Sequence, residues 1–215
     1  MTTALFSTAY FPPISYVAAL MLHNQIVIEA KETFPKQTYR NRMEIMTAGG
    51  VRTLSVPVIR NNHSRTDEVL IDYKERWNII HLRTIEAAYS ASPYYLYYKD
   101  DIDSLLKYKY NSLLDLNQAI LEWILRRLKA HTTVALTTDY DPVPPIDDYR
   151  TAFSPKRRLP ADGFKPYYQV FSDRQPFAHN LSILDMMMNL GPETETIKGM
   201  FYKFVLKETP TGYNC

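Results

Sequence analysis

The stretch from residue 77 to residue 128 constrains the fold most, because apolar residues recur at helical spacing through it. The spacing predicts helices over residues 77–89, 95–108 and 113–128, and Ser92-Pro93 breaks the first from the second. The apolar residues expected near one face of the first helix are Trp77, Ile80, Leu82, Ile85 and Ala88. The centre of the chain is therefore predicted to be helical.

Strand-like runs lie on both sides of this helical centre. They cover residues 4–7, 25–29, 42–46, 53–58, 69–71 and 133–136, and Gly49-Gly50 marks a hairpin turn. Two further helices are predicted over residues 14–22 and 182–190, the second ending at Gly191-Pro192. The expected fold class is mixed α/β (α+β), with an N-terminal mixed β-sheet, a central helical region and a helical C-terminal segment.

Length and composition favour one cytoplasmic domain. The 215 residues fit a single domain, 1–215, in which residues 139–166 form a long proline-rich loop. A formal net charge of +2 argues against a nucleic-acid partner. The sole cysteine, Cys215, leaves no disulfide within the chain, which favours a reducing compartment. No apolar run approaches the roughly 20 residues of a transmembrane segment, and no signal peptide is evident.

The sequence Lys-Gln-Thr-Tyr-Arg-Asn-Arg at residues 36–42 is the strongest candidate for a binding site. Lys36 and Arg42 offer cations suited to a phosphate or a carboxylate, and Tyr39 and Asn41 interleave them as in polar pockets. The alternative is a solvated sheet edge on which the cations prevent aggregation.

Candidate acids and bases are few. His81 lies four residues after Trp77 on the same side of a helix and is a candidate general base. The alternative is a half-buried histidine whose hydrogen bond to a neighbour is purely structural. Glu29 ends an apolar strand and is a candidate acid or base, or a counter-charge for Lys36 or Arg42. The five histidines lack metal-ligand spacing and no glycine-rich phosphate loop occurs, so neither a metal nor a cofactor is expected.

Tyrosines cluster around Ser92-Pro93, at positions 89, 94, 95, 97 and 98. Tyr89 and its neighbours could stack against a sugar or base, but packing between helices is the favoured interpretation of such a cluster. Asp185 lies in an otherwise apolar helix, where an unpaired carboxylate is costly, and it is expected to form a structural salt bridge.

Several motifs together resemble the WbqC-like protein family, in the branch found in Bacteroides-type bacteria. The matching motifs are Ala9 through Tyr16, residues 36–42, Leu54 through Val58, Trp77 with His81, Ala88-Tyr89 with Ser92 through Tyr95, and Asn180 through Asp185. The chain departs from the wider family at Tyr39, where a tryptophan is usual, and at Thr8-Ala9, near the place of a glutamine. It also has Ala30-Lys31 in place of an acidic pair, with Glu29 and Glu32 as substitutes.

The resemblance implies a poorly characterised bacterial protein from gene clusters for O-antigen and other surface polysaccharides. A transferase acting on an activated sugar is one expectation, with a small-molecule substrate that bears a phosphate or carboxylate. A non-catalytic binding or scaffold protein in a polysaccharide assembly complex is the alternative. The catalytic candidates are His81 and Glu29, and the substrate-binding candidates are Lys36, Tyr39, Asn41, Arg42, Trp77 and Tyr89.

Overall fold

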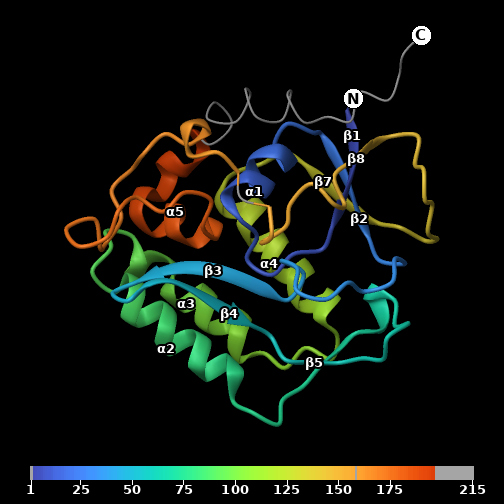
Figure 1. Ribbon diagram of the computed structural model, residues 1–215, viewed down its shortest axis with the longest axis horizontal. Coiled ribbons are helices and arrows are strands. Elements are labelled where there is room, and N and C mark those ends of the chain that lie inside the picture. Colours follow the sequence, from blue (N-terminus) through green and yellow to red (C-terminus); the bar gives the residue numbers. More distant parts are fainter. Residues whose placement is uncertain (1, 158, 197–215) are drawn as a thin grey trace.

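A four-stranded parallel sheet forms one end of the molecule in the computed structural model, which describes residues 2–157 and 159–196 (Figure 1). Its strands are β1 (Thr3–Ser7), β2 (Gln25–Glu29), β7 (Thr133–Leu136) and β8 (Asp147–Asp148), in the order β7-β2-β1-β8. Every neighbouring pair is parallel. Parallel neighbours need a crossover connection, and α1 (Ile14–Leu20) provides the one between β1 and β2.

The connection between β2 and β7 holds most of the other elements. A hairpin of β3 (Arg42–Thr47) and β4 (Gly50–Ser55) comes first, followed by the short antiparallel pair β5 (Val58–Ile59) and β6 (Leu70–Ile71). Three helices follow: α2 (Trp77–Tyr89), α3 (Tyr95–Lys107) and α4 (Leu113–Arg127). The last α-helix described, α5 (Ile183–Leu190), lies after β8 in the chain and is followed directly by a 3-10 helix (Gly191–Thr196).

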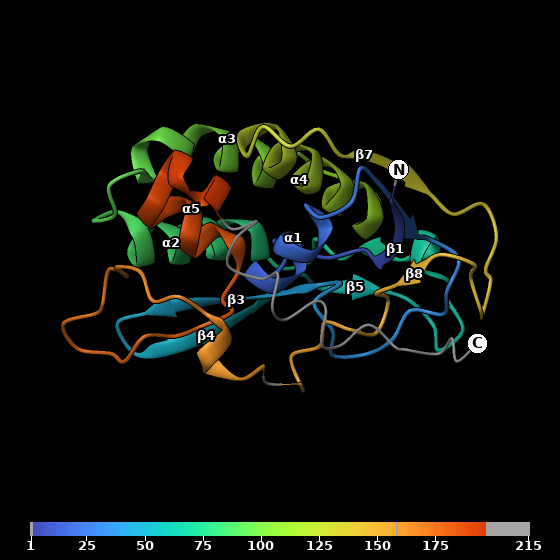
Figure 2. The same ribbon diagram turned by 90° about the horizontal axis from the view of Figure 1, so that it is seen from above.

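Helices α2, α3, α4 and α5 gather on one side of the molecule, and the β3–β4 hairpin runs along the other (Figure 2). Helix α1 lies between them, and all of its residues are buried. One hydrophobic core includes residues from these helices and from the strands. The mixed α/β class is confirmed, although the strands of the described residues form three separate sheets instead of one N-terminal sheet. No helix in the described residues is long and apolar enough to cross a membrane.

Two local expectations differ from the structure. Ile80, expected on the core face of α2, is 49% exposed, because the buried face instead carries Trp77, His81, Ile85 and Ala88. Residues 139–166 contain β8, which adds an edge strand to the parallel sheet. Two residues carry too little periodicity to reveal a strand, so its partner β1 defines it.

The loop after β1 connects distant parts of the chain through its backbone. Tyr10 N–H donates to the Tyr39 carbonyl (2.9 Å), Ile14 N–H to the Leu181 carbonyl (2.9 Å), and Ile183 N–H to the Pro12 carbonyl (2.8 Å). Residues 10–15 are therefore the junction between the parallel sheet, the entry to the hairpin and the start of α5.

A buried ion network closes the carboxyl ends of β2 and β8. Arg150, 6% exposed, pairs with Glu29, which is 0% exposed (Nη1–Oε2 3.1 Å), and with Asp148 (Nη2–Oδ2 2.6 Å). The other Glu29 oxygen accepts from Thr137 Oγ1 and Lys31 N–H, both at 2.8 Å. The counter-charge of Glu29 is thus Arg150, not Lys36 or Arg42.

A second buried pair extends this network. Arg40 binds Glu32 through Nη2 (2.6 Å) and also donates to the Arg150 carbonyl (3.4 Å). Burial raises the pKa of Glu32, and the charge of Arg40 opposes that rise. The carboxyl edge of a parallel sheet is a common ligand position, and here ion pairs occupy the part of it that follows β2 and β8.

Removing one partner of the Glu29–Arg150 pair should destabilise the protein more than removing both. Arg150→Met leaves the Glu29 carboxylate buried without a cation and is expected to lower the free energy of unfolding by roughly 3–5 kcal/mol. Combining it with Glu29→Gln removes the buried charge, so the double variant should be more stable than Arg150→Met alone. Urea unfolding measures both. This account would be contradicted if the double variant lost as much stability as the sum of the losses of the two single variants.

Candidate functional site

The sequence-predicted residues separate into several groups, and the first is an aromatic cluster around His81. Tyr10 Oη lies 2.8 Å from His81 Nδ1, and the Trp77 ring meets the imidazole edge-on at 5.1 Å between centroids. All three side chains are buried. The structure therefore joins Tyr10 to the Trp77–His81 motif in one contact group.

The environment of His81 favours its neutral form. Its pKa is lowered to about 4, mainly by burial; a hydrogen bond with the Ser55 backbone opposes this shift, and the charge of Arg52 adds to it. Burial also raises the pKa of Tyr10, so its hydroxyl keeps its proton and donates to Nδ1 of the neutral ring. The base role of His81 stays a prediction, but its Nδ1 already has a partner.

Residues 36–42 do not act as one unit. Lys36 is exposed, whereas Asn41 Nδ2 donates to the Val56 carbonyl at 2.9 Å and helps to attach the hairpin. Arg42 is half-buried, and its Nε has no hydrogen-bond partner among the described residues. Tyr39 donates to Glu44 Oε2 at 3.3 Å. Burial is the main cause that raises the Tyr39 pKa, and the Glu44 charge adds to it.

Tyr89 belongs to a different buried group, centred on Asp185. Tyr89 donates to Asp185 Oδ1 (3.0 Å), while Tyr167 (2.6 Å) and Gln169 (2.8 Å) donate to Oδ2. The expectation that Asp185 forms a salt bridge is wrong, because neutral hydrogen-bond donors satisfy its carboxylate. Burial raises the Asp185 pKa, and these three hydrogen bonds oppose the rise. The group fastens residues 167–169 to α5.

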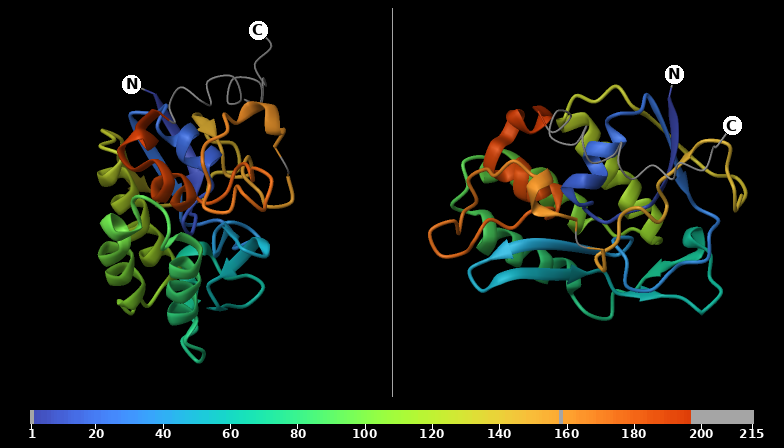
Figure 3. Two further views of the ribbon diagram at one scale, coloured as in Figure 1. Left: turned by 90° about the vertical axis from the view of Figure 1, so that its left-hand side faces the viewer. Right: turned by 45° about the horizontal axis from the view of Figure 1, so that its top comes forward.

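A groove lies between the β3–β4 hairpin and the C-terminal wall, by which we mean residues 155–157 and 159–181. Its volume is about 350 Å³, within the usual range for small-molecule sites. The lining residues are Tyr39, Glu44, Met46, Gly50, Val51, Pro155, Arg157, Leu159, Gln175, Pro176, Phe177, Ala178, His179, Asn180 and Leu181. Figure 3 shows the orange part of this wall beside the hairpin, and Gln175 Nε2 donates to the Ala48 carbonyl (3.2 Å). We call this space the first groove.

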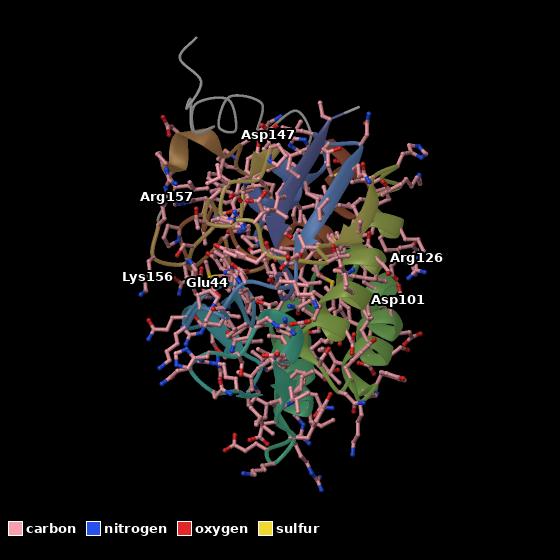
Figure 4. The ribbon with its side chains drawn as sticks, turned by 90° about the vertical axis from the view of Figure 1, so that its right-hand side faces the viewer. Glu44, Asp101, Arg126, Asp147, Lys156 and Arg157 are labelled. Carbon is pink, nitrogen blue, oxygen red and sulfur yellow. The ribbon has the colours of Figure 1, made fainter. Side chains whose placement is uncertain are left out.

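Short contacts hold the two walls of the first groove in place. Ser182 N–H donates to the Glu44 carbonyl (2.8 Å), and Asn180 Oδ1 accepts from Ser15 N–H (3.0 Å). Figure 4 shows Glu44 on the same side of the molecule as Lys156 and Arg157, away from Asp101 and Arg126. The groove thus combines an acid, an aromatic hydroxyl and positive charge.

His179 lines the first groove with its ring held by a backbone carbonyl. Its Nε2 lies 3.0 Å from the Leu159 carbonyl. A carbonyl only accepts, so Nε2 carries the proton, and in the neutral ring Nδ1 is left as the acceptor. Of the predicted site residues, only Tyr39 lines this groove. Sequence reasoning missed Glu44 and His179, although His179 directly precedes the Asn180–Asp185 motif.

No group of three or more His, Cys, Asp and Glu side chains in residues 2–157 and 159–196 is arranged to hold a metal ion. Cys215 lies outside the described residues.

Comparison with known proteins identifies the family. The model of the WbqC-like protein family matches residues 8–157. The chain belongs to this family. It is also similar to "Uncharacterized protein Rv1507c" of Mycobacterium tuberculosis (strain ATCC 25618 / H37Rv), with 24% identity over 225 residues that cover 88% of this chain and 94% of the relative. No solved structure matches the chain. The family match includes Tyr39 and Glu44 but ends before His179.

His81 should make the protein less stable in mild acid. Its pKa is 6.5 in the unfolded chain and about 4 in the fold, so between these values the unfolded state binds more protons. The contribution of His81 to the free energy of unfolding is therefore fully present above pH 6.5. It decreases as the pH drops through this window, by about 3 kcal/mol in total.

Urea unfolding at several pH values measures this loss. Burial also lowers the pKa of His23, so wild type must be compared with His81→Gln, which keeps a polar partner for Tyr10 but does not titrate. The variant should lose stability less steeply between pH 6.5 and 4. If stability falls with pH equally steeply in wild type and in His81→Gln, His81 is not the group responsible.

Proposed function

We propose that this chain is a transferase of bacterial surface-polysaccharide biosynthesis that binds an activated sugar in the first groove. The observation that carries the proposal is the placement of His179, held through Nε2 by the Leu159 carbonyl, in the same groove as the Tyr39–Glu44 pair. A histidine whose Nε2 is held by a carbonyl keeps Nδ1 as its acceptor, and such a ring is suited to general base catalysis. The groove volume of about 350 Å³ also suits a sugar.

The groove residues take distinct roles in this proposal. An acceptor hydroxyl or amine loses its proton to His179 Nδ1 while its oxygen or nitrogen attacks the electrophilic carbon of the donor. The bond to the leaving group breaks, and that group departs with the electron pair. Arg157 carries the positive charge that favours a phosphate or carboxylate. Tyr39 and Glu44 hydrogen-bond to the sugar hydroxyls.

The two walls contribute differently. The hairpin wall, with Tyr39 and Glu44, lies within the family match, whereas most of the C-terminal wall lies beyond it. We therefore assign recognition common to the family to the hairpin wall and selection of the particular substrate to the C-terminal wall. His81 and Glu29 would support the site through the cluster with Tyr10 and the pair with Arg150.

A panel of nucleotide-linked sugars, each paired with hydroxyl and amine acceptors, tests the proposal. Donor binding is measured by calorimetry and transfer by mass spectrometry. His179→Gln is expected to slow transfer roughly 10²–10⁴-fold with little change in donor affinity, because it removes a base and not a binding contact. Glu44→Gln should weaken donor binding.

His63→Gln is the matched control, since His63 is exposed and does not line the first groove. It should transfer at the wild-type rate. The proposal fails if no donor of the panel binds, or if His179→Gln and His63→Gln transfer equally fast.

A non-catalytic scaffold in a polysaccharide assembly complex is the second candidate, favoured by exposed apolar side chains. Val143, in the 139–166 loop, is 81% exposed, and Leu96, within the tyrosine cluster, is 80% exposed. Tyr97 and Tyr140 are also exposed, and tyrosines are enriched in protein interfaces. Capture of one stoichiometric partner that Leu96→Glu or Val143→Glu abolishes, without turnover of any sugar, would favour this function over the transferase.

A further inference from the structure

A second groove lies on the opposite face of the β3–β4 hairpin. Its volume is about 440 Å³, and its lining residues are Thr47, Ala48, Gly49, Arg52, Ile80, Arg83, Thr84, Ala87 and Ala88. Cross-strand partners share a face, and neighbours along a strand alternate. Met46 and Val51 form one pair and line the first groove, whereas Arg52, paired with Ile45, lies on the other face. The two grooves therefore share the hairpin as a wall.

One stripe of α2 forms the far wall of the second groove. Ile80, Arg83, Thr84, Ala87 and Ala88 follow the i, i+3, i+4, i+7, i+8 spacing that places side chains on one helix face. This stripe contains Ile80, the large apolar side chain that the core leaves 49% exposed. With Ala48 and Ala87 it gives the groove an apolar floor.

No carboxylate of the described residues pairs with the arginines of the second groove. Arg52 and Arg83 are exposed, and neither guanidinium makes an ion pair or hydrogen bond with a residue of the described chain. None of the lining residues is acidic. By contrast Arg40, Arg127 and Arg150 each have a carboxylate partner. Two planar guanidiniums beside one concavity present five donors each to an anion.

The hairpin turn leaves room for a ligand to approach. Gly49 lies at this turn, and a Cβ there would meet only Thr47 Oγ1, at 3.9 Å. Gly49 thus lines the second groove without crowding it.

We propose that the second groove binds a phosphate ester that carries an apolar group, with the phosphate on Arg52 and Arg83 and the apolar group along Ile80 and Ala87. A phosphate monoester carries nearly two negative charges at neutral pH. It therefore matches the charge of two guanidiniums better than a single carboxylate, with one negative charge, would. The ester is either a membrane lipid phosphate or a soluble molecule. This site is separate from the proposed transfer site.

A bound anion should be visible at His81. The charge of Arg52 is one cause of the low His81 pKa, so a phosphate on Arg52 partly cancels that effect. The pKa of His81 should therefore rise from about 4 when the groove is filled, and it should rise in Arg52→Ala without ligand. Imidazole resonances followed by NMR during a pH titration report both changes.

Calorimetry with octyl phosphate and with inorganic phosphate at low salt tests the proposal directly. Octyl phosphate should bind more tightly, because its chain covers Ile80, and Ile80→Glu should remove this advantage. Arg52→Ala and Arg83→Ala should each weaken octyl phosphate binding roughly tenfold, the value of one charge-assisted contact. Arg126→Ala is the matched control, since Arg126 is exposed and lies outside both grooves.

Vesicles distinguish the two sources of the ester. A lipid phosphate is assigned if the protein floats with vesicles that contain phosphatidic acid, a phosphate monoester, but not with phosphatidylcholine alone, and if Arg52→Ala abolishes this flotation. Binding of octyl phosphate without flotation assigns a soluble ester.

The proposal is overturned if neither octyl phosphate nor the vesicles bind, or if Arg126→Ala weakens binding as much as the groove variants. Because Glu44 and His179 lie in the other groove, that outcome leaves the transferase proposal standing.

Discussion

The backbone hydrogen bonds of residues 10–15 are the contacts on which the arrangement of this protein depends. One short loop receives or donates bonds with Tyr39, Leu181 and Ile183, residues that lie far apart in the chain. Phe11 (φ 39°) and Asn180 (φ 56°) both adopt a left-handed backbone conformation there. This conformation is tolerated by asparagine but is unusual for a bulky aromatic residue. Packing of the fully buried Phe11 ring offsets that cost.

Local signals were enough to predict most of the elements. The bounds of α2 and β2 agree with the sequence pattern because periodicity and a proline or a β-branched run define them locally. Elements that depend on distant partners were not predictable: β8 exists because β1 is beside it, and Ile80 is exposed because the buried face of α2 carries Trp77, His81, Ile85 and Ala88 instead. The neutral partners of Asp185 come from a loop without periodicity.

The candidate site was harder to predict than the fold. The residues selected by resemblance to the family are largely buried: Tyr10, Trp77 and His81 contact one another, and Tyr89 contacts Asp185. Glu44 and His179, which line the first groove, come from distant parts of the chain. A single sequence does not reveal which half-buried polar residues face a common space, because that depends on how the C-terminal wall folds back over the hairpin.

The shared hairpin has a thermodynamic consequence. Two antiparallel strands form a thin ribbon, and each of its faces is a wall of a different groove. Any ligand that bends or tightens this ribbon on one face changes the dimensions of the space on the other. By linkage, an effect of one ligand on the affinity for a second is matched by an equal effect in return. The ribbon therefore provides a route for reciprocal coupling between occupants that never touch.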